Sequence, residues 1–205
     1  MRKTIFNRST IIGGYAALII FTLAAYSNGQ DSRSGNVKTS LRPVRVIGAG
    51  TTVSPAGSSL SRNNDGIFFT LHSSGLPPGH AVTAWLAVFN NPENCATRPC
   101  TPADFANPDV NGTLLNTGGQ IIGLDGTATY GAFRAVGDVT GARPGVGTGN
   151  GLVDPGSAEI HIVLRSHGPA VLGDPTVLGQ QLSIFGGGCT AMNMCMNLQT
   201  SIHQR

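Results

Sequence analysis

The most regular alternation in the chain lies in residues 157–168, SAEIHIVLRSHG. Its apolar side chains share one parity and its polar ones the other: Ile160, Ile162 and Leu164 against Glu159, His161, Arg165 and His167. Successive side chains of a β-strand point to opposite faces of the sheet, so this pattern predicts a strand with one buried face. We expect the apolar set to anchor a core and the polar set, Arg165 and His167 included, to form an exposed face.

The rest of the chain favours the same class of structure. Glycine and proline, 29 and 12 residues, are scattered between β-branched and aromatic runs, which is typical of short strands joined by turns. Further strands are predicted near residues 44–53, 67–73, 80–90, 110–124, 127–136 and 195–203. The fold predicted is all-β, an antiparallel β-sandwich with little helix, and a small β-barrel is the alternative.

Three segments carry more specific expectations. His80–Asn90 is apolar on both parities, so this strand should be central and covered on both sides, with the Trp85 indole N–H bonded to an acceptor. Ser54–Asn64 is predicted as a loop. In the final strand, one parity is expected to face in (Met196, Leu198, Thr200 and Ile202) and the other out (Asn197, Gln199, Ser201 and His203).

The N-terminal segment has the layout of a secretory signal peptide. Basic residues near the start precede an apolar run and then small residues, which predicts a signal peptide over residues 1–29. A membrane anchor is the alternative reading. Residues 30–42 are predicted to be a disordered leader, and residues 43–205 a single sandwich domain, in a secreted or periplasmic protein.

Removing residues 1–29 changes the charge balance. Arg2, Lys3 and Arg8 supply the whole formal charge of +3, and from residue 30 onward Lys/Arg and Asp/Glu balance. The chain from residue 30 has a single lysine, Lys38, and therefore no polybasic patch. We accordingly expect neither nucleic acid nor, after cleavage, a membrane as partner.

The four cysteines predict two disulfides, because an exported chain folds in an oxidising compartment. Three connectivities are possible for Cys95, Cys100, Cys189 and Cys195, and pairing within each neighbouring pair is the simplest. Four thiolates on one zinc ion are the alternative, although the spacing departs from the usual two-residue knuckles.

Several of these segments together resemble a group of uncharacterised secreted bacterial β-domain proteins. The resemblance rests on HIVLRSHGPA and on FGGGC followed by C-x-NLQ, and it implies an exported β-domain without implying an activity. A weaker likeness is to CHRD-type and copper/zinc superoxide dismutase-like sandwiches. The closely spaced metal-binding histidines of the dismutases are absent here, so their metal site is not carried over.

Glu159 and His161 are the best candidates for a metal site, since they lie two residues apart on one predicted face. Copper or zinc would need further ligands, for which His72 and His203 are candidates. His167 lies roughly 20 Å from His161 along an extended strand, too far to share one ion. The alternative is an ordinary polar face with a Glu–His or Glu–Arg contact and no cofactor.

No catalytic motif stands out in the sequence. It lacks G-x-S-x-G, H-E-x-x-H and a phosphate-binding loop, so no catalytic residue is assigned. The leading hypothesis is a non-catalytic exported protein that acts by surface interaction with a cell-envelope or extracellular partner. A metal-binding protein or metalloenzyme is the alternative, and a hydrolase with a dispersed triad the second. The glycine-rich segment Gly137–Gly156 is predicted to be a long functional or disordered loop.

Overall fold

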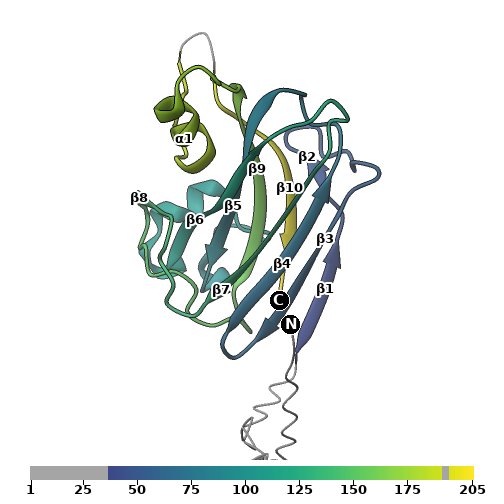
Figure 1. The fold of residues 1–205 in the computed structure, drawn as a ribbon. Helices are drawn as coiled ribbons and strands as arrows, with labels where there is room; N and C mark the ends of the chain where they lie inside the picture. Colours follow the sequence, from purple (N-terminus) through teal and green to yellow (C-terminus); the bar gives the residue numbers. More distant parts are fainter. Residues whose placement is uncertain (1–36, 191–193) are drawn as a thin grey trace, which may run out of the picture. The chain divides into compact units, whose positions relative to one another are not determined.

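The computed structural model describes residues 37–190 and 194–205, and the predicted signal peptide lies outside them. They form two packed antiparallel sheets (Figure 1). The small sheet has the order β1 (Lys38–Arg42), β3 (Gly57–Asn63), β4 (Gly66–Ser73), β7 (Ala128–Ala135). The large sheet has the order β2 (Arg45–Val46), β10 (Met196–His203), β9 (Glu159–Pro169), β5 (His80–Phe89), β6 (Gly112–Ile121), β8 (Ala142–Gly147). The predicted antiparallel β-sandwich is confirmed.

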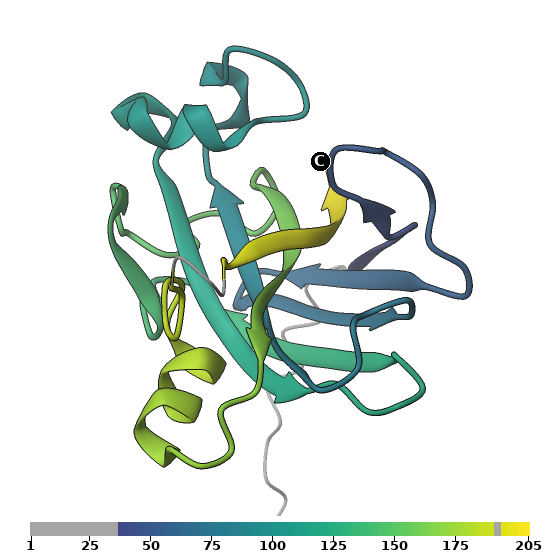
Figure 2. The ribbon, with the colours of Figure 1, turned by 90° about the horizontal axis from the view of Figure 1, so that it is seen from above.

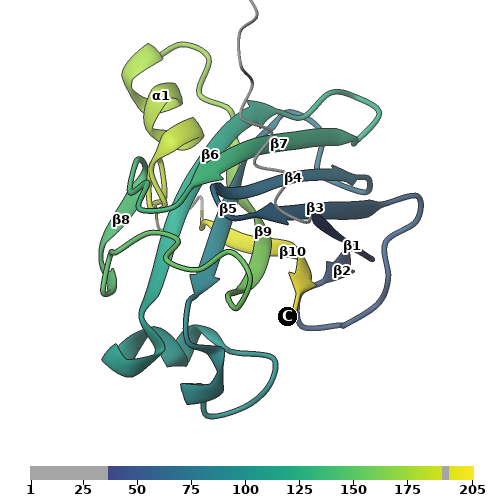
Figure 3. The same ribbon diagram turned by 90° about the horizontal axis from the view of Figure 1, so that it is seen from below.

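Helical structure is short. One α-helix, α1 (Pro175–Ser183), follows β9, and three 3₁₀ turns connect β5 to β6: η1 (Pro92–Asn94), η2 (Pro102–Ala106) and η3 (Pro108–Val110). Figures 2 and 3 show α1, β8 and these turns on the side of the large sheet that faces away from the small sheet. Asp174 begins α1 as its N-cap, because its carboxylate accepts from the N–H groups of Thr176 and Val177.

The main core lies between the two sheets. Ile160, Ile162 and Leu164 of β9 are fully buried there, as the alternation predicted, and Leu86 of β5 and Phe69 of β4 pack in the same cluster. Burial of this apolar surface stabilises the sandwich by about 25 cal/mol per Å² removed from water.

The other face of the large sheet carries a second, smaller core. Trp85, Ala87 and Phe89 of β5 pack there with Val110 and Leu114, and the partly buried Phe105, Val146 and Phe185 complete the cluster. The predicted covering of β5 on both sides is therefore confirmed. The Trp85 indole N–H also finds its acceptor, the Thr83 hydroxyl, at 2.7 Å.

The domain begins earlier than predicted. Residues 38–42, placed in the disordered leader, form β1 and pair with Ser58–Arg62 of β3. The segment predicted as a loop before Asn64 contains β3 itself. The prediction failed because small polar side chains, which are typical of loops, make up most of this strand. Ser58, Leu60 and Arg62 point inward from it.

The predicted orientation of the last strand is wrong. Gln199, Ser201 and His203 of β10 are buried, whereas Met196 is 57% exposed. Polar partners from the small sheet explain the reversal: the Ser58 hydroxyl lies 2.7 Å from His203 Nε2, and Ser73 bonds Gln199. A β-bulge between Asn197 and Gln199 shifts the register within the strand.

The main core gives a direct test of packing. Leu164→Ala should lower the free energy of unfolding by about 2–5 kcal/mol, because it removes a buried side chain and leaves a cavity. Leu124→Ala makes the same truncation at a 97% exposed position and should change it by about 0.5 kcal/mol or less. Urea unfolding of both variants compares them, and equal losses would contradict the assignment of β9 to the core.

The buried His203 predicts how stability depends on pH. Burial, followed by the charges of Arg62 and Arg42, lowers the pKa of His203 from 6.5 to about 4. The unfolded chain therefore binds more protons between these values, and stability should fall by about 3 kcal/mol as pH falls from 6.5 through 4. Urea unfolding across this range measures the loss. It should shrink in His203→Gln, and an unchanged pH dependence in that variant would contradict this role of His203.

Candidate ligand pocket

Glu159 and His161 meet on the outer face of β9. His161 Nε2 lies 2.7 Å from Glu159 Oε1, and the Cys100 backbone N–H donates to the same oxygen over 2.6 Å. Burial alone would raise the pKa of Glu159, but the hydrogen bonds from His161 and Cys100 outweigh it and lower that pKa. The ionised carboxylate is acceptor-only, so His161 Nε2 carries the proton and donates.

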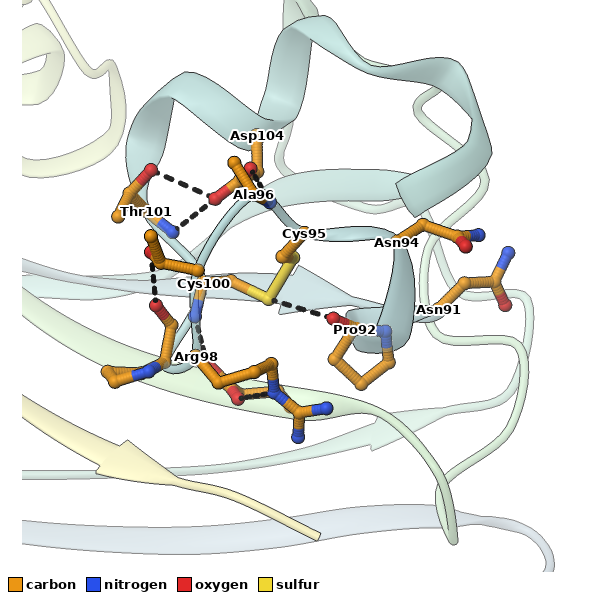
Figure 4. Close-up of a disulfide and its surroundings, with 12 residues drawn as sticks. Asn91, Pro92, Asn94, Cys95, Ala96, Arg98, Cys100, Thr101 and Asp104 are labelled. Atoms are coloured by element: carbon orange, nitrogen blue, oxygen red, sulfur yellow. Dashed lines mark hydrogen bonds and ion pairs between the residues drawn. A yellow bond between two sulfur atoms is a disulfide. The ribbon is translucent and has the colours of Figure 1, made fainter.

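The loop closed by the Cys95–Cys100 disulfide (Figure 4) supplies a further partner of this carboxylate. Arg98, within that loop, places Nε 3.4 Å from Glu159 Oε2. Near the C-terminus, Gln204 lies 3.4 Å from the same oxygen. The disulfide thus holds together a short loop that neutralises a fully buried charge on β9.

Asp104 fixes the turn that follows this loop. Its carboxylate accepts from the N–H and hydroxyl of Thr101 and from the N–H of Ala96, at 2.6, 2.9 and 2.8 Å (Figure 4). The backbone hydrogen bonds from Ala96 and Thr101 lower the pKa of Asp104. Asp104 therefore anchors η2 against the disulfide loop.

The other two candidate metal ligands lie elsewhere. His72 is exposed on the outer face of the small sheet, where its Nδ1 lies 3.0 Å from the Thr129 hydroxyl. His203 lies between the sheets with Ser40 and Ser58. The structure brings together only Glu159 and His161 of the four predicted ligands.

Arg165 and His167 do not form the exposed polar face that alternation suggested. His167 is fully buried, with Nε2 2.9 Å from the Thr83 hydroxyl and Nδ1 2.9 Å from the Gly187 carbonyl oxygen. Arg165 is half-buried and donates through Nε to the Phe185 carbonyl oxygen over 2.7 Å. The segment after α1 covers this face, which strand periodicity alone does not reveal.

The cysteines form the two disulfides of the simplest predicted connectivity, Cys95–Cys100 and Cys189–Cys195. His167, Cys189 and Cys195 are the one group of three possible metal ligands within the part of the chain that the structure describes. Thiolate is the form of cysteine that binds metals. With both sulfurs in a disulfide, this group is not a metal site in the oxidised chain.

Three serine–histidine contacts bear on a hydrolase. His80 Nδ1 lies 3.0 Å from the Ser166 hydroxyl, and His203 contacts Ser40 and Ser58 as described above. A triad also needs a carboxylate that orients the histidine. Within residues 37–190 and 194–205, neither His80 nor His203 contacts one.

A cavity of about 410 Å³ lies over the second core, next to His161. Its floor comes from β5, β6 and β9, and its walls come from η2, β8 and the segment after α1. Apolar side chains and glycines make up most of the lining: Ala87, Phe89, Pro102, Ala103, Phe105, Ala106, Leu114, Gly145, Val146, Gly147, Val163 and Phe185. A cavity of this size and composition suits a small organic ligand.

Three polar residues line the cavity: Arg143, His161 and Asn197. His161 uses Nε2 for Glu159, so its other ring nitrogen, Nδ1, is the acceptor of the neutral ring. Asn197 accepts from Arg165 through Oδ1, which leaves its amide N–H groups as donors. The Arg143 guanidinium lies over the ring of Phe185, 4.1 Å from its centroid.

Sequence reasoning missed the walls of this cavity. The glycine-rich segment predicted to be a functional or disordered loop contains β8, which forms one wall. Phe105 reaches the floor because Gly112 has no side chain: a Cβ there would lie 2.6 Å from the Phe105 ring. One feature of the sequence did indicate such walls: β5 is apolar on both faces, so other segments of the chain had to pack against the face turned away from the main core.

No helix within the described ranges is long and apolar enough to cross a membrane. Comparison with models of known protein families and with curated proteins gave no match.

The buried carboxylate can be tested by an isosteric change. Glu159→Gln should lower the free energy of unfolding by about 1–3 kcal/mol, because the amide removes the charge and sets an N–H group among donors. Glu93→Gln makes the same change at an exposed position and is the control. Chemical denaturation at neutral pH provides the measurement, and a Glu159→Gln protein as stable as the control would refute the role given to this carboxylate.

Proposed function

We propose that this chain is an exported, non-catalytic β-sandwich that binds a small apolar ligand in the cavity over β5 and β9. The cavity carries this proposal: it is about 410 Å³ in volume and has Phe89, Phe105 and Phe185 in its lining. Concave sites with apolar and aromatic walls and few polar groups are the usual form of small-molecule sites. This proposal replaces a general surface interaction with a defined site on one face of the large sheet, and an interaction with a cell-envelope or extracellular partner stays a prediction.

The chemistry of the lining supports binding rather than covalent catalysis. Among the described residues, no serine, threonine, cysteine or lysine side chain lines the cavity, so the common hydroxyl, thiol and amine nucleophiles are missing from its walls. His161 is oriented by a buried carboxylate, an arrangement that also fixes the direction of a hydrogen bond to a ligand. Its Nδ1 is the acceptor that a ligand hydroxyl or N–H would use.

The proposal includes export of the chain to an oxidising compartment. Two disulfides suit an oxidising compartment, and the predicted signal peptide would deliver the chain there. The metal-binding alternative stays a prediction in which Glu159 and His161 would supply two ligands. Copper or zinc that survives dialysis and is lost in His161→Ala would favour it over the binding of an apolar ligand.

Blocking the cavity tests the proposal. The neutral solvatochromic naphthalene dye prodan should bind the purified chain with a blue shift of its emission. Ala103→Trp should weaken this binding on the order of tenfold or more, because an indole at the exposed Ala103 would occupy the cavity from the η2 wall.

Ala96→Trp is the matched control, since Ala96 is also exposed, lies before η2 and does not line the cavity. Equal prodan affinity in the parent chain and both variants would place the dye elsewhere. Absence of dye binding by the parent chain would likewise count against a ligand-binding cavity.

A further inference from the structure

Two arginines share one aromatic ring at the edge of the cavity. The guanidinium carbons of Arg143 and Arg165 lie 4.1 and 4.0 Å from the centroid of the Phe185 ring. Cation–π attraction favours each contact separately. The two like charges nevertheless repel each other, and this pair therefore concentrates positive charge beside the ligand site.

The structure shows no acidic partner for either arginine within the described ranges. Arg165 donates to two neutral oxygens, the Phe185 carbonyl and Asn197 Oδ1, at 2.7 and 2.8 Å. Arg143 is exposed and has Phe185 as its neighbour. Burial, and then the charge of Arg143, lowers the pKa of Arg165, as expected when a cation has no counter-charge.

Glu159 and Asp104, the acids described beside the cavity, do not offer that counter-charge. Glu159 is fully buried behind His161 and is engaged with Cys100 and Arg98, and no carboxylate lines the cavity. Asp104 in the η2 wall is also buried, and its oxygens are occupied by N–H and hydroxyl donors. The cavity thus combines apolar walls with positive charge at one side.

We propose that the ligand is a small hydrophobic carboxylate, with its apolar body on the aromatic walls and its anionic group at Arg143. Arg143 presents a planar set of N–H donors that suits a carboxylate, and the Asn197 amide supplies a further donor in the cavity lining. The anion relieves the repulsion between Arg143 and Arg165. This assignment rests on the proposed function and adds the ligand's chemical class.

A matched pair of probes tests the carboxylate. Isothermal titration with 2-naphthoate and 2-naphthamide compares the same aromatic body with and without the negative charge. The parent chain should bind 2-naphthoate on the order of tenfold more tightly or better, since a charge-assisted hydrogen bond replaces a neutral one. Raised ionic strength should weaken the preference.

The variant Arg143→Met keeps the length and apolar stem of the side chain and removes the charge. It should bind 2-naphthoate about as weakly as 2-naphthamide and leave the affinity for 2-naphthamide within about twofold of the parent. Arg45→Met is the control for net charge, because Arg45 is also exposed and lies on β2, at the far edge of the large sheet from β8. It should preserve the full preference for 2-naphthoate.

The outcomes separate the two proposals. Equal affinity for both probes in the parent chain, with Ala103→Trp blocking both, would overturn the carboxylate while the ligand cavity stands. A preference for 2-naphthoate that survives Arg143→Met would also overturn the assigned anion position. Failure of prodan and both naphthalene probes to bind would reject the cavity and the carboxylate together.

Discussion

The arrangement of this protein depends on its central strand, β5, which is apolar on both faces and therefore has to be buried on both. β5 places Leu86 and its inner neighbours in the main core and Trp85, Ala87 and Phe89 on the opposite face. A two-sheet sandwich covers only the first of these faces. The connection between β5 and β6, strand β8 and the segment around α1 cover the second, and the cavity lies where their cover is incomplete.

Two buried charged groups, Glu159 and Arg62, each have a local set of hydrogen-bond partners. On the outer face, Glu159 takes its donors from the Cys95–Cys100 loop and His161. Arg62, on β3 of the small sheet, donates to the carbonyl oxygens of Pro155, Ala158 and His203. Buried charge is tolerated only when its hydrogen-bonding capacity is used, so these networks fix how loops and termini join the sandwich.

The sequence was a good guide where burial followed hydrophobicity. Period-two alternation identified the inward set of β9, and export chemistry anticipated both disulfides. It failed where polar residues face inward. Ser58 in β3 and Gln199, Ser201 and His203 in β10 are buried because they bond one another across the sheets or with nearby polar groups.

For the candidate site, too, the sequence predicted contacts within one strand and not contacts between distant segments. Adjacency on one strand face predicted the contact between Glu159 and His161. Other lining residues, among them Phe105, Arg143 and Phe185, come from separate segments of the chain. Nothing in their local patterns says that they meet, because tertiary folding brings them together. The predicted companions His72 and His203 belong to other surfaces for the same reason: sequence periodicity assigns a face within one strand and does not say which sheet layer lies opposite.

The chain's single tryptophan makes one region of the protein accessible to fluorescence measurements. The Trp85 ring makes an edge-on contact with Phe185, with centroids 5.1 Å apart, and Phe185 is the ring that carries the two arginines. Any displacement of the segment after α1 therefore changes the surroundings of the only indole in the protein. Intrinsic fluorescence becomes a built-in optical report on this side of the molecule, with no label attached and no competing tryptophan signal.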